Sequence, residues 1–182
     1  MRPENYAGYR LFIPKQAVGA NLIYFDFFNA ATSGHDIILA SVVPVVSGAA
    51  DVTGVLGVDL FLNRTTAIGT GGTAAGFNLS AFTSASITGV GAGAAPMPAG
   101  ITARLTPTGG ATAGANIGWC SVFTEDTNAG TYLAALNNLV TMGLPDAPPV
   151  TIAQGSGISV VQGAVASVGN IGFNVAFSLK AR

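Results

Sequence analysis

Histidine, cysteine and serine side chains are the first candidates for catalysis in a new sequence. His35 is the only histidine, and it stands in the segment TSGHD beside Asp36. A serine, a histidine and an aspartate can form a nucleophile with its base, but such a triad is recognised by geometry and not by adjacency. The nucleophile motif G-x-S-x-G is missing, because Gly155-Ser156-Gly157 has a different spacing. We therefore interpret His35 as a turn residue and predict no catalytic residue.

The motifs that bind metals or phosphates are also incomplete. One histidine and one cysteine cannot supply the usual four ligands of zinc. The glycine cluster GTGGTAAG at 69–76 lacks the Lys-Ser or Lys-Thr pair of a phosphate-binding loop. The acidic cluster Glu125, Asp126 and Asn128 opens like a calcium loop, but the later positions carry no carboxylate, so the alternative is an ordinary exposed loop. We predict no cofactor and no metal.

Composition excludes several further classes of protein. Of the 182 residues, 8% are charged and 49% are hydrophobic, against about 25% charged in an average soluble domain. This balance excludes a disordered tail, and the net charge of −1 argues against binding to nucleic acid. A single cysteine excludes an internal disulfide framework. The long uncharged runs are interrupted by Gly, Thr, Ser and Pro, and the polar start MRPENYAGYR resembles no secretory signal, so we predict no membrane segment.

The shortage of charge also has a consequence for the surface. A free domain keeps about 25–35% of its surface residues charged, which this chain cannot approach. Either other copies or a partner cover much of the surface, or small neutral residues make it inert. We favour burial in an assembly, because exposed apolar patches mark interaction sites.

Alternation of apolar and polar residues is the main secondary-structure signal. In residues 171–179 every odd position is apolar and every even position is small or polar, and residues 101–106 and 56–63 alternate in the same way. These patterns predict half-buried antiparallel strands. Residues 22–29 and 37–46 are apolar on both faces and flank TSGHD, which predicts a hairpin whose second strand Pro44 pushes toward an edge or bulge. The further predicted strands are residues 11–14, 116–124, 150–153 and 157–162, where Trp119 and the thiol Cys120 would pack within a strand.

The predicted elements define a fold class. About eight strands, turns rich in glycine and proline, and one short helical pattern at residues 131–140 favour an all-β antiparallel sandwich of jelly-roll type. An immunoglobulin-type sandwich would need a Cys, Trp, Cys spacing that this sequence lacks. We predict an extended N-terminal arm over residues 1–15 and a single sandwich domain over residues 16–182.

Positive charge concentrates at the two ends of the chain. Residues 1–15 together with 180–182 carry a net charge of +4, and the rest of the chain carries −5. Positive ends on an acidic body suggest an arm that docks on another copy or on a lattice, with a frayed terminus as the alternative. The candidate interaction residues of the arm are Arg2, Tyr6, Tyr9, Arg10, Leu11, Phe12 and Lys15.

Two aspartates interrupt otherwise apolar strands. A buried carboxylate needs a charged or hydrogen-bonding partner, so Asp26 or Asp59 could pair with Arg64 or Arg104. The alternative is that both aspartates face outward at a strand edge.

Two stretches carry a resemblance to a family. VDLFLNRTTAIGTGGTAA at 58–75 looks like stretches in small structural proteins of tailed bacteriophages, and IAQGSGISVV at 152–161 is similar to their closing hairpin. The resemblance implies a β-sandwich on the virion surface, a head decoration or cement protein that clamps the major capsid protein lattice, with a trimer favoured. It implies no catalytic residues. The alternatives are a tail, fibre or adhesin module that binds a receptor or glycan, and a hydrolase-like sandwich that uses His35.

Overall fold

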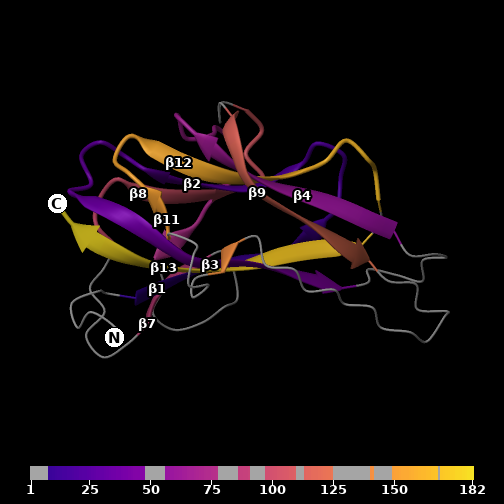
Figure 1. The fold of residues 1–182 in the computed structure, drawn as a ribbon, viewed down its shortest axis with the longest axis horizontal. Coiled ribbons are helices and arrows are strands. Elements are labelled where there is room, and N and C mark those ends of the chain that lie inside the picture. Colours follow the sequence, from indigo (N-terminus) through magenta and orange to yellow (C-terminus); the bar gives the residue numbers. More distant parts are fainter. Residues whose placement is uncertain are drawn as a thin grey trace.

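The computed structural model describes residues 8–47, 56–77, 86–90, 97–109, 113–124, 140–141, 149–167 and 169–182. These residues form two sheets and contain no helix, and the sheets face each other as the two layers of a sandwich (Figure 1). Sheet A contains, in spatial order, β10 (Val140–Thr141), β3 (His35–Ser47), β13 (Asn170–Ala181), β1 (Gly8–Ala17), β7 (Ser86–Val90) and β6 (Gly76–Phe77), and β11 (Val150–Ile152) also pairs with β3. Sheet B contains β5 (Thr73–Ala74), β8 (Ile101–Leu105), β2 (Ile23–Asn29), β12 (Ser156–Gln162), β4 (Leu56–Thr65) and β9 (Ala113–Thr124).

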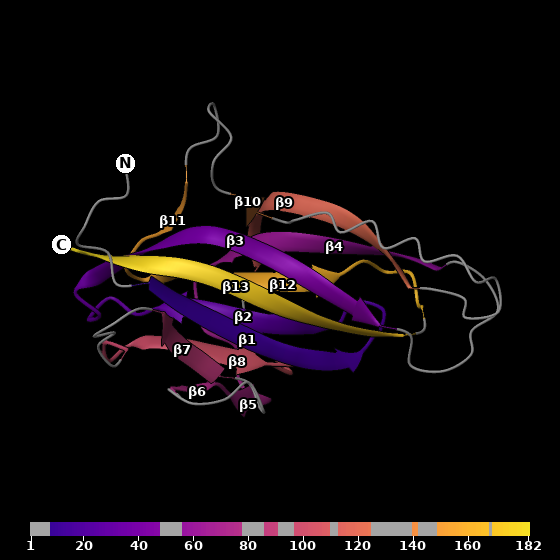
Figure 2. The same cartoon turned by 90° about the horizontal axis from the view of Figure 1, so that it is seen from below.

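The strand order is that of a jelly roll. In sheet A the order β1, β13, β3, β10/β11 faces the order β2, β12, β4, β9 in sheet B. The chain crosses from one sheet to the other at each step from β1 to β4, and it does so again from β11 to β13. Two interlocked Greek keys of this kind define the jelly roll, so the predicted fold class is confirmed. Strands β5 to β8 are inserted between β4 and β9 and extend both sheets beside β1 and β2 (Figure 2).

The predicted alternation is present in the strands. In β13 the odd positions from Ile171 to Leu179 are all buried, and in β8 Ile101, Ala103 and Leu105 are buried. Val58, Leu60 and Leu62 of β4 point inward in the same way. Period-two patterning therefore located the core-facing side of these strands because one face of each packs against the opposite sheet.

Aromatic side chains join the two layers at the centre of the core. The Phe27 ring of β2 and the Phe177 ring of β13 have their centroids 4.8 Å apart, and Phe25 and Phe173 form a second pair at 5.4 Å with an edge-on arrangement. Tyr9 of β1 stacks on Phe177 at 5.4 Å. Such tilted and edge-on aromatic contacts stabilise a core beyond the area that they bury.

The predicted hairpin over residues 22–29 and 37–46 is wrong. Both segments are strands, but β2 lies in sheet B and β3 lies in sheet A, so the turn at residues 30–34 crosses between layers. A segment that is apolar on both faces predicts a strand, but its pattern does not indicate which of the two sheets the strand joins. Pro44 pairs with Phe173 of β13, and on its other side the pairing of β3 with β10 ends at Val42. Among the described residues Pro44 therefore has a strand on one side only, in agreement with its lack of an N–H donor.

The predicted arm must be corrected for residues 8–15. These residues belong to β1, which pairs with β13 on one side and with β7 on the other. Leu11 and Ile13 are fully buried, so this segment forms part of the core. Residues 1–7 lie outside the described residues, as does the predicted helix at 131–140 except for Val140, which begins β10.

Candidate interaction surface

Strand β1 divides the predicted interaction residues between its two faces. Tyr9 and Leu11 point into the core, and burial raises the pKa of the Tyr9 hydroxyl. Arg10 and Lys15 are exposed and Phe12 is half-buried. Arg2 and Tyr6 lie outside the described residues. Among the candidate residues that the structure describes, only Arg10, Phe12 and Lys15 therefore contribute to the outer surface.

The outward residues of β1 line a hollow on sheet A. Its volume is about 520 Å³, and its lining residues are Arg10, Phe12, Ser41, Val43, Asn174, Val175 and Ala176. Strand register explains this set, because Arg10, Ala176 and Ser41 form one cross-strand row, and Phe12, Asn174 and Val43 form the next. The hollow combines a guanidinium, an aromatic ring and an amide with small apolar groups, so it can contact a neutral or acidic surface.

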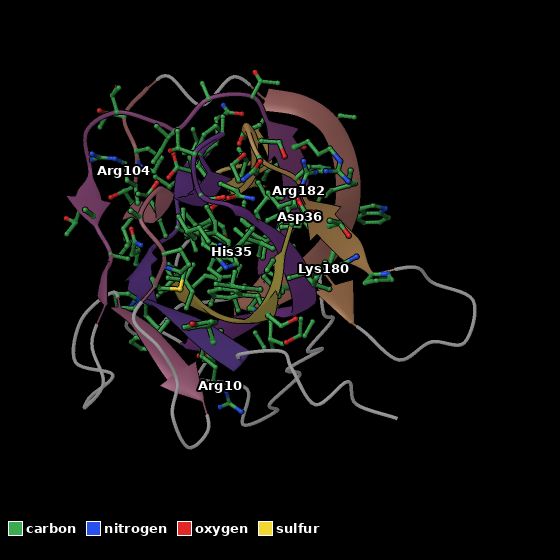
Figure 3. The ribbon with its side chains drawn as sticks, turned by 90° about the vertical axis from the view of Figure 1, so that its left-hand side faces the viewer. Arg10, His35, Asp36, Arg104, Lys180 and Arg182 are labelled. Carbon is green, nitrogen blue, oxygen red and sulfur yellow. The ribbon has the colours of Figure 1, made fainter. Side chains whose placement is uncertain are left out.

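Part of the positive charge at the C-terminus is neutralised within the chain. The Nε atom of Arg182 lies 2.8 Å from Oδ1 of Asp36, and Lys180 is the register partner of Asp36 on the neighbouring strand. Figure 3 shows Arg182 beside Asp36, with Arg10 well separated from both. One positive charge at the C-terminus, that of Arg182, is therefore already paired with an acidic residue of the same chain. This pairing weakens the prediction that the chain ends dock through their positive charge.

His35 helps to close the turn that connects the two sheets. Its Nδ1 atom lies 2.7 Å from the carbonyl oxygen of Ser33, so this nitrogen donates a hydrogen bond to the backbone. The Ser33 hydroxyl donates to the His35 carbonyl at 3.2 Å and not to the ring, while Asp36 binds Arg182. Asn29 donates to the same His35 carbonyl at 2.9 Å. The Ser33, His35 and Asp36 side chains thus make a structural turn and not a nucleophile with its base.

Asp26 lies on the outer side of sheet B but is fully buried. The segment at residues 66–72 covers it, and the Gly69 N–H donates a hydrogen bond to its Oδ2 atom. Desolvation raises the pKa of Asp26, while hydrogen bonds from the Gly69 and Arg104 backbones and the Arg104 charge oppose this rise. The Arg104 guanidinium donates to the Gly71 carbonyl at 2.9 Å instead of forming an ion pair. Asp26 therefore interacts with Arg104, as predicted, but through the charge and the backbone of Arg104 and not through a direct ion pair.

The glycine cluster at 69–76 has a structural explanation at this place. A Cβ atom at Gly69 would lie 2.6 Å from Cβ of Pro107 and would also press on Asp26. Gly72 has φ of +63°, and a Cβ atom there would collide with the Leu105 carbonyl oxygen. The glycines thus allow the segment to lie flat on sheet B and to place its N–H on the buried carboxylate. This packing role explains the glycines without a phosphate-binding function.

The remaining charged pair proposed from the sequence is not formed. Asp59 is exposed and accepts a hydrogen bond from the Ser121 hydroxyl at 2.5 Å. Arg64 donates to the Thr151 carbonyl at 3.2 Å. Asp59 therefore faces outward near a sheet edge, which was the second of the two structures predicted for it from the sequence.

An exposed tryptophan is the surface feature that the sequence interpretation missed. Trp119 is 65% exposed, whereas Cys120 is buried and its pKa is raised to about 11 by burial, with a smaller contribution from Asp59. The prediction of packing is correct for Cys120 and wrong for Trp119. Successive residues of a strand point to opposite faces, so the alternation that buries Cys120 already places Trp119 outside.

Trp119 ends an apolar row across the outer face of sheet B. Register pairs Trp119 with Phe61, Phe61 with Val161, and Val161 with Ile23. None of these four side chains is fully buried, and Trp119 is the most exposed of them. We refer to Ile23, Val161, Phe61 and Trp119 as the outer apolar row. It runs from β2 through β12 and β4 to β9, the last of the described strands on this side of sheet B.

Other predicted features can be placed only in part. Residues 125–128, which suggested a calcium loop, lie outside the described residues. Where side chains are described, no three His, Cys, Asp or Glu residues gather into a group that could hold a metal ion. The described part of the chain also contains no helix of the length and hydrophobicity needed to cross a bilayer.

Comparison of this chain with models of protein families, with curated proteins and with solved structures found no match.

Proposed function

We propose that this chain is a virion structural protein, a decoration or cement protein that binds the major capsid protein lattice of a tailed bacteriophage and also binds other copies of itself. Its place would be the capsid surface, and the resemblance of residues 58–75 and 152–161 favours a trimer. The jelly roll agrees with this proposal, since viral capsid domains are among the proteins that use this fold.

The observation that carries the proposal is the neutral, partly apolar exterior of both sheets. Phe12, Ile38, Val43 and Val45 are half-buried on the outer face of sheet A, and the outer apolar row lies on sheet B. The whole chain has only 8% charged residues to keep such faces dispersed in water. Apolar faces of this kind are best satisfied by contact with other protein surfaces.

The proposed mechanism is burial of these faces on a repeating lattice. Apolar area removed from water contributes about 25 cal/mol per Å². Attachment at several points adds avidity without new contacts. A protein that binds only the assembled shell stabilises the shell, because any ligand of one state shifts the equilibrium toward that state.

The test is co-sedimentation of the purified protein with empty capsids of the phage that encodes it. We expect the protein to pellet with capsids and to raise their melting temperature, with bovine serum albumin as the control that does neither. Protein that remains in the supernatant and leaves the capsid melting temperature unchanged would overturn the proposal.

A second candidate function is a tail, fibre or adhesin module that binds a receptor or glycan. The exposed Trp119 ring favours it, because an aromatic face can stack on a sugar. Trp119 stands on strand β9, however, and not in one of the glycine-rich loops. Binding to host cells or glycans without binding to capsids would select this second function.

A further inference from the structure

We infer that the hollow on the outer face of sheet A is a binding site for a uronic acid, a sugar residue that carries a carboxylate. This inference goes beyond the proposed function, because a capsid lattice offers protein surfaces whereas this site takes a carbohydrate. The site also differs in place from the exposed Trp119 ring, which belongs to the other sheet.

The shape of the hollow follows from the sizes of the side chains in one cross-strand row. Arg10, Ala176 and Ser41 are register partners on β1, β13 and β3, so a long and a short side chain stand on either side of the small Ala176. Because neighbouring strands are about 5 Å apart, the backbones of Arg10 and Ser41 lie about 10 Å from each other. The volume of about 520 Å³ falls within the range of about 300–1,000 Å³ that small-molecule sites occupy.

The charged group of the hollow is a guanidinium that has no partner in the described part of the chain. Arg10 is exposed, and it is the only charged residue among the described lining residues. No ion pair or side-chain hydrogen bond with another described residue occupies it, and Figure 3 shows it well separated from the other labelled charged side chains. A guanidinium binds a carboxylate through two parallel hydrogen bonds, whereas phosphate groups are recognised by clusters of arginines. A single arginine therefore favours a carboxylate.

The neutral groups of the hollow match the rest of a sugar ring. Asn174 and Ser41 lie on adjacent strands, and the described residues provide no hydrogen-bond partner for either side chain. An amide and a hydroxyl can both donate and accept hydrogen bonds, as sugar hydroxyls do. Val43, Ala176 and the wall formed by Phe12 supply apolar contact for the C–H groups of the ring. A few polar groups that fix orientation within an apolar lining are typical of small-molecule sites.

A sugar fits this hollow better than an acidic segment of another protein does. In the row of Arg10, Ala176 and Ser41 each strand is paired on both sides, because Thr88 of β7 lies beyond Arg10 and Thr141 of β10 lies beyond Ser41. An extended peptide therefore finds no free strand edge with which to pair at this place. A single Asp or Glu side chain could reach the guanidinium, but it would leave most of the hollow empty.

Titration of the purified protein with matched sugars tests the ligand. Galacturonic, glucuronic and mannuronic acid, as single sugars and as short oligosaccharides, are compared with galactose, glucose and mannose, which have a CH₂OH group in place of the carboxylate. We expect at least one acid to bind in calorimetry and to shift the side-chain amide signal of Asn174 in NMR spectra. Its neutral counterpart should bind at least about tenfold more weakly, because hydrogen bonds to charged groups are stronger than those between neutral groups.

Two variants and one charge-matched control test the location of the site. Arg10→Gln should weaken binding of the uronic acid by at least about tenfold and remove the preference over the neutral sugar. Asn174→Ala should weaken binding of both the acid and the neutral sugar. Both residues are exposed, so we expect both variants to fold. Lys180→Gln removes a positive charge from an exposed position of β13 that does not line the hollow, and it should bind the uronic acid as the parent protein does.

The inference is wrong if no uronic acid binds, or if Arg10→Gln, shown to be folded by circular dichroism, binds the acid as tightly as the parent protein does. Equal binding of acetate, inorganic phosphate or tetraglutamate would also contradict it, because these probes carry the negative charge without the sugar. If a variant does not fold, an unshifted Asn174 signal in the parent protein overturns the inference. None of these measurements uses capsids, so co-sedimentation decides the proposed function separately.

Discussion

Asp26 shows how a single residue reports a contact between distant segments. The sequence marks it only as a carboxylate in an apolar strand, but the structure buries it under residues 66–72 and supplies the Gly69 N–H as a partner. Its Oδ1 atom is buried and accepts no hydrogen bond among the described residues. Burial of a charged oxygen without a partner is costly, whereas a protonated carboxyl group reduces this cost.

We expect the stability of the protein to fall as Asp26 loses its proton. Desolvation raises the pKa of Asp26 above its ordinary value, so the folded state holds the proton more tightly than the unfolded state does. The resulting stabilisation is complete below the ordinary pKa and is lost as the pH rises through the raised pKa. Thermal unfolding between pH 3 and pH 7 should therefore show a steeper loss of stability for the parent protein than for Asp26→Asn.

Ser159→Ala is the control for this prediction. Ser159 is the buried cross-strand neighbour of Asp26 and carries no charge, so its removal should change stability by the same amount at every pH. Equal pH dependence of Asp26→Asn and the parent protein would contradict the role assigned to Asp26.

At the scale of elements, β1 shows how the same residues can suggest two structures. Arg10 and Lys15 favoured an interaction arm, while residues 11–14 also read as a strand. Tyr9, Leu11 and Ile13 alternate with outward residues, and β13 and β7 hold both edges of the segment. The pairing partners lie more than 70 residues away in sequence, so local pattern alone did not select the inner strand over the arm.

Substitutions in β1 should separate the core role from the surface role. Leu11→Ala should destabilise the protein by about 2–5 kcal/mol, because it removes a fully buried side chain and leaves a cavity. Arg10→Ala on the exposed face should change stability by less than about 0.5 kcal/mol. Chemical denaturation of both variants provides the measurement, and a Leu11→Ala change as small as that of Arg10→Ala would contradict the placement of β1.

At the scale of the whole molecule, the neutral exterior decides which forces can drive assembly. The chain has seven basic and eight acidic residues, and Arg182 and Asp36 already pair within it. In the proposed self-association, apolar contact is therefore the main source of attraction between copies. Such contacts depend little on salt, because salt screens charges and not backbone hydrogen bonds or apolar burial.

We expect the self-association constant to change by less than about threefold between about 0.05 M and 0.5 M sodium chloride, because the Debye length falls from more than 10 Å to less than 8 Å without any charged contact to screen. Analytical ultracentrifugation at several salt concentrations provides the measurement. A loss of association by tenfold or more at high salt would instead support docking through the positive chain ends.

The sequence by itself determined the all-β sandwich, the inward faces of its strands and the shortage of charge, because period-two alternation and composition are properties of local segments and of totals. It also contained the information that Trp119 and Cys120 point to opposite faces. Only the tertiary structure decided that β2 and β3 lie in different sheets, that β1 is an inner strand, that residues 66–72 cover Asp26 and that the outer apolar row crosses four strands of sheet B. These features depend on which distant strands become neighbours. A local pattern does not specify that choice, because the hydrogen bonds between strands are made by the backbone, which is nearly the same in every residue.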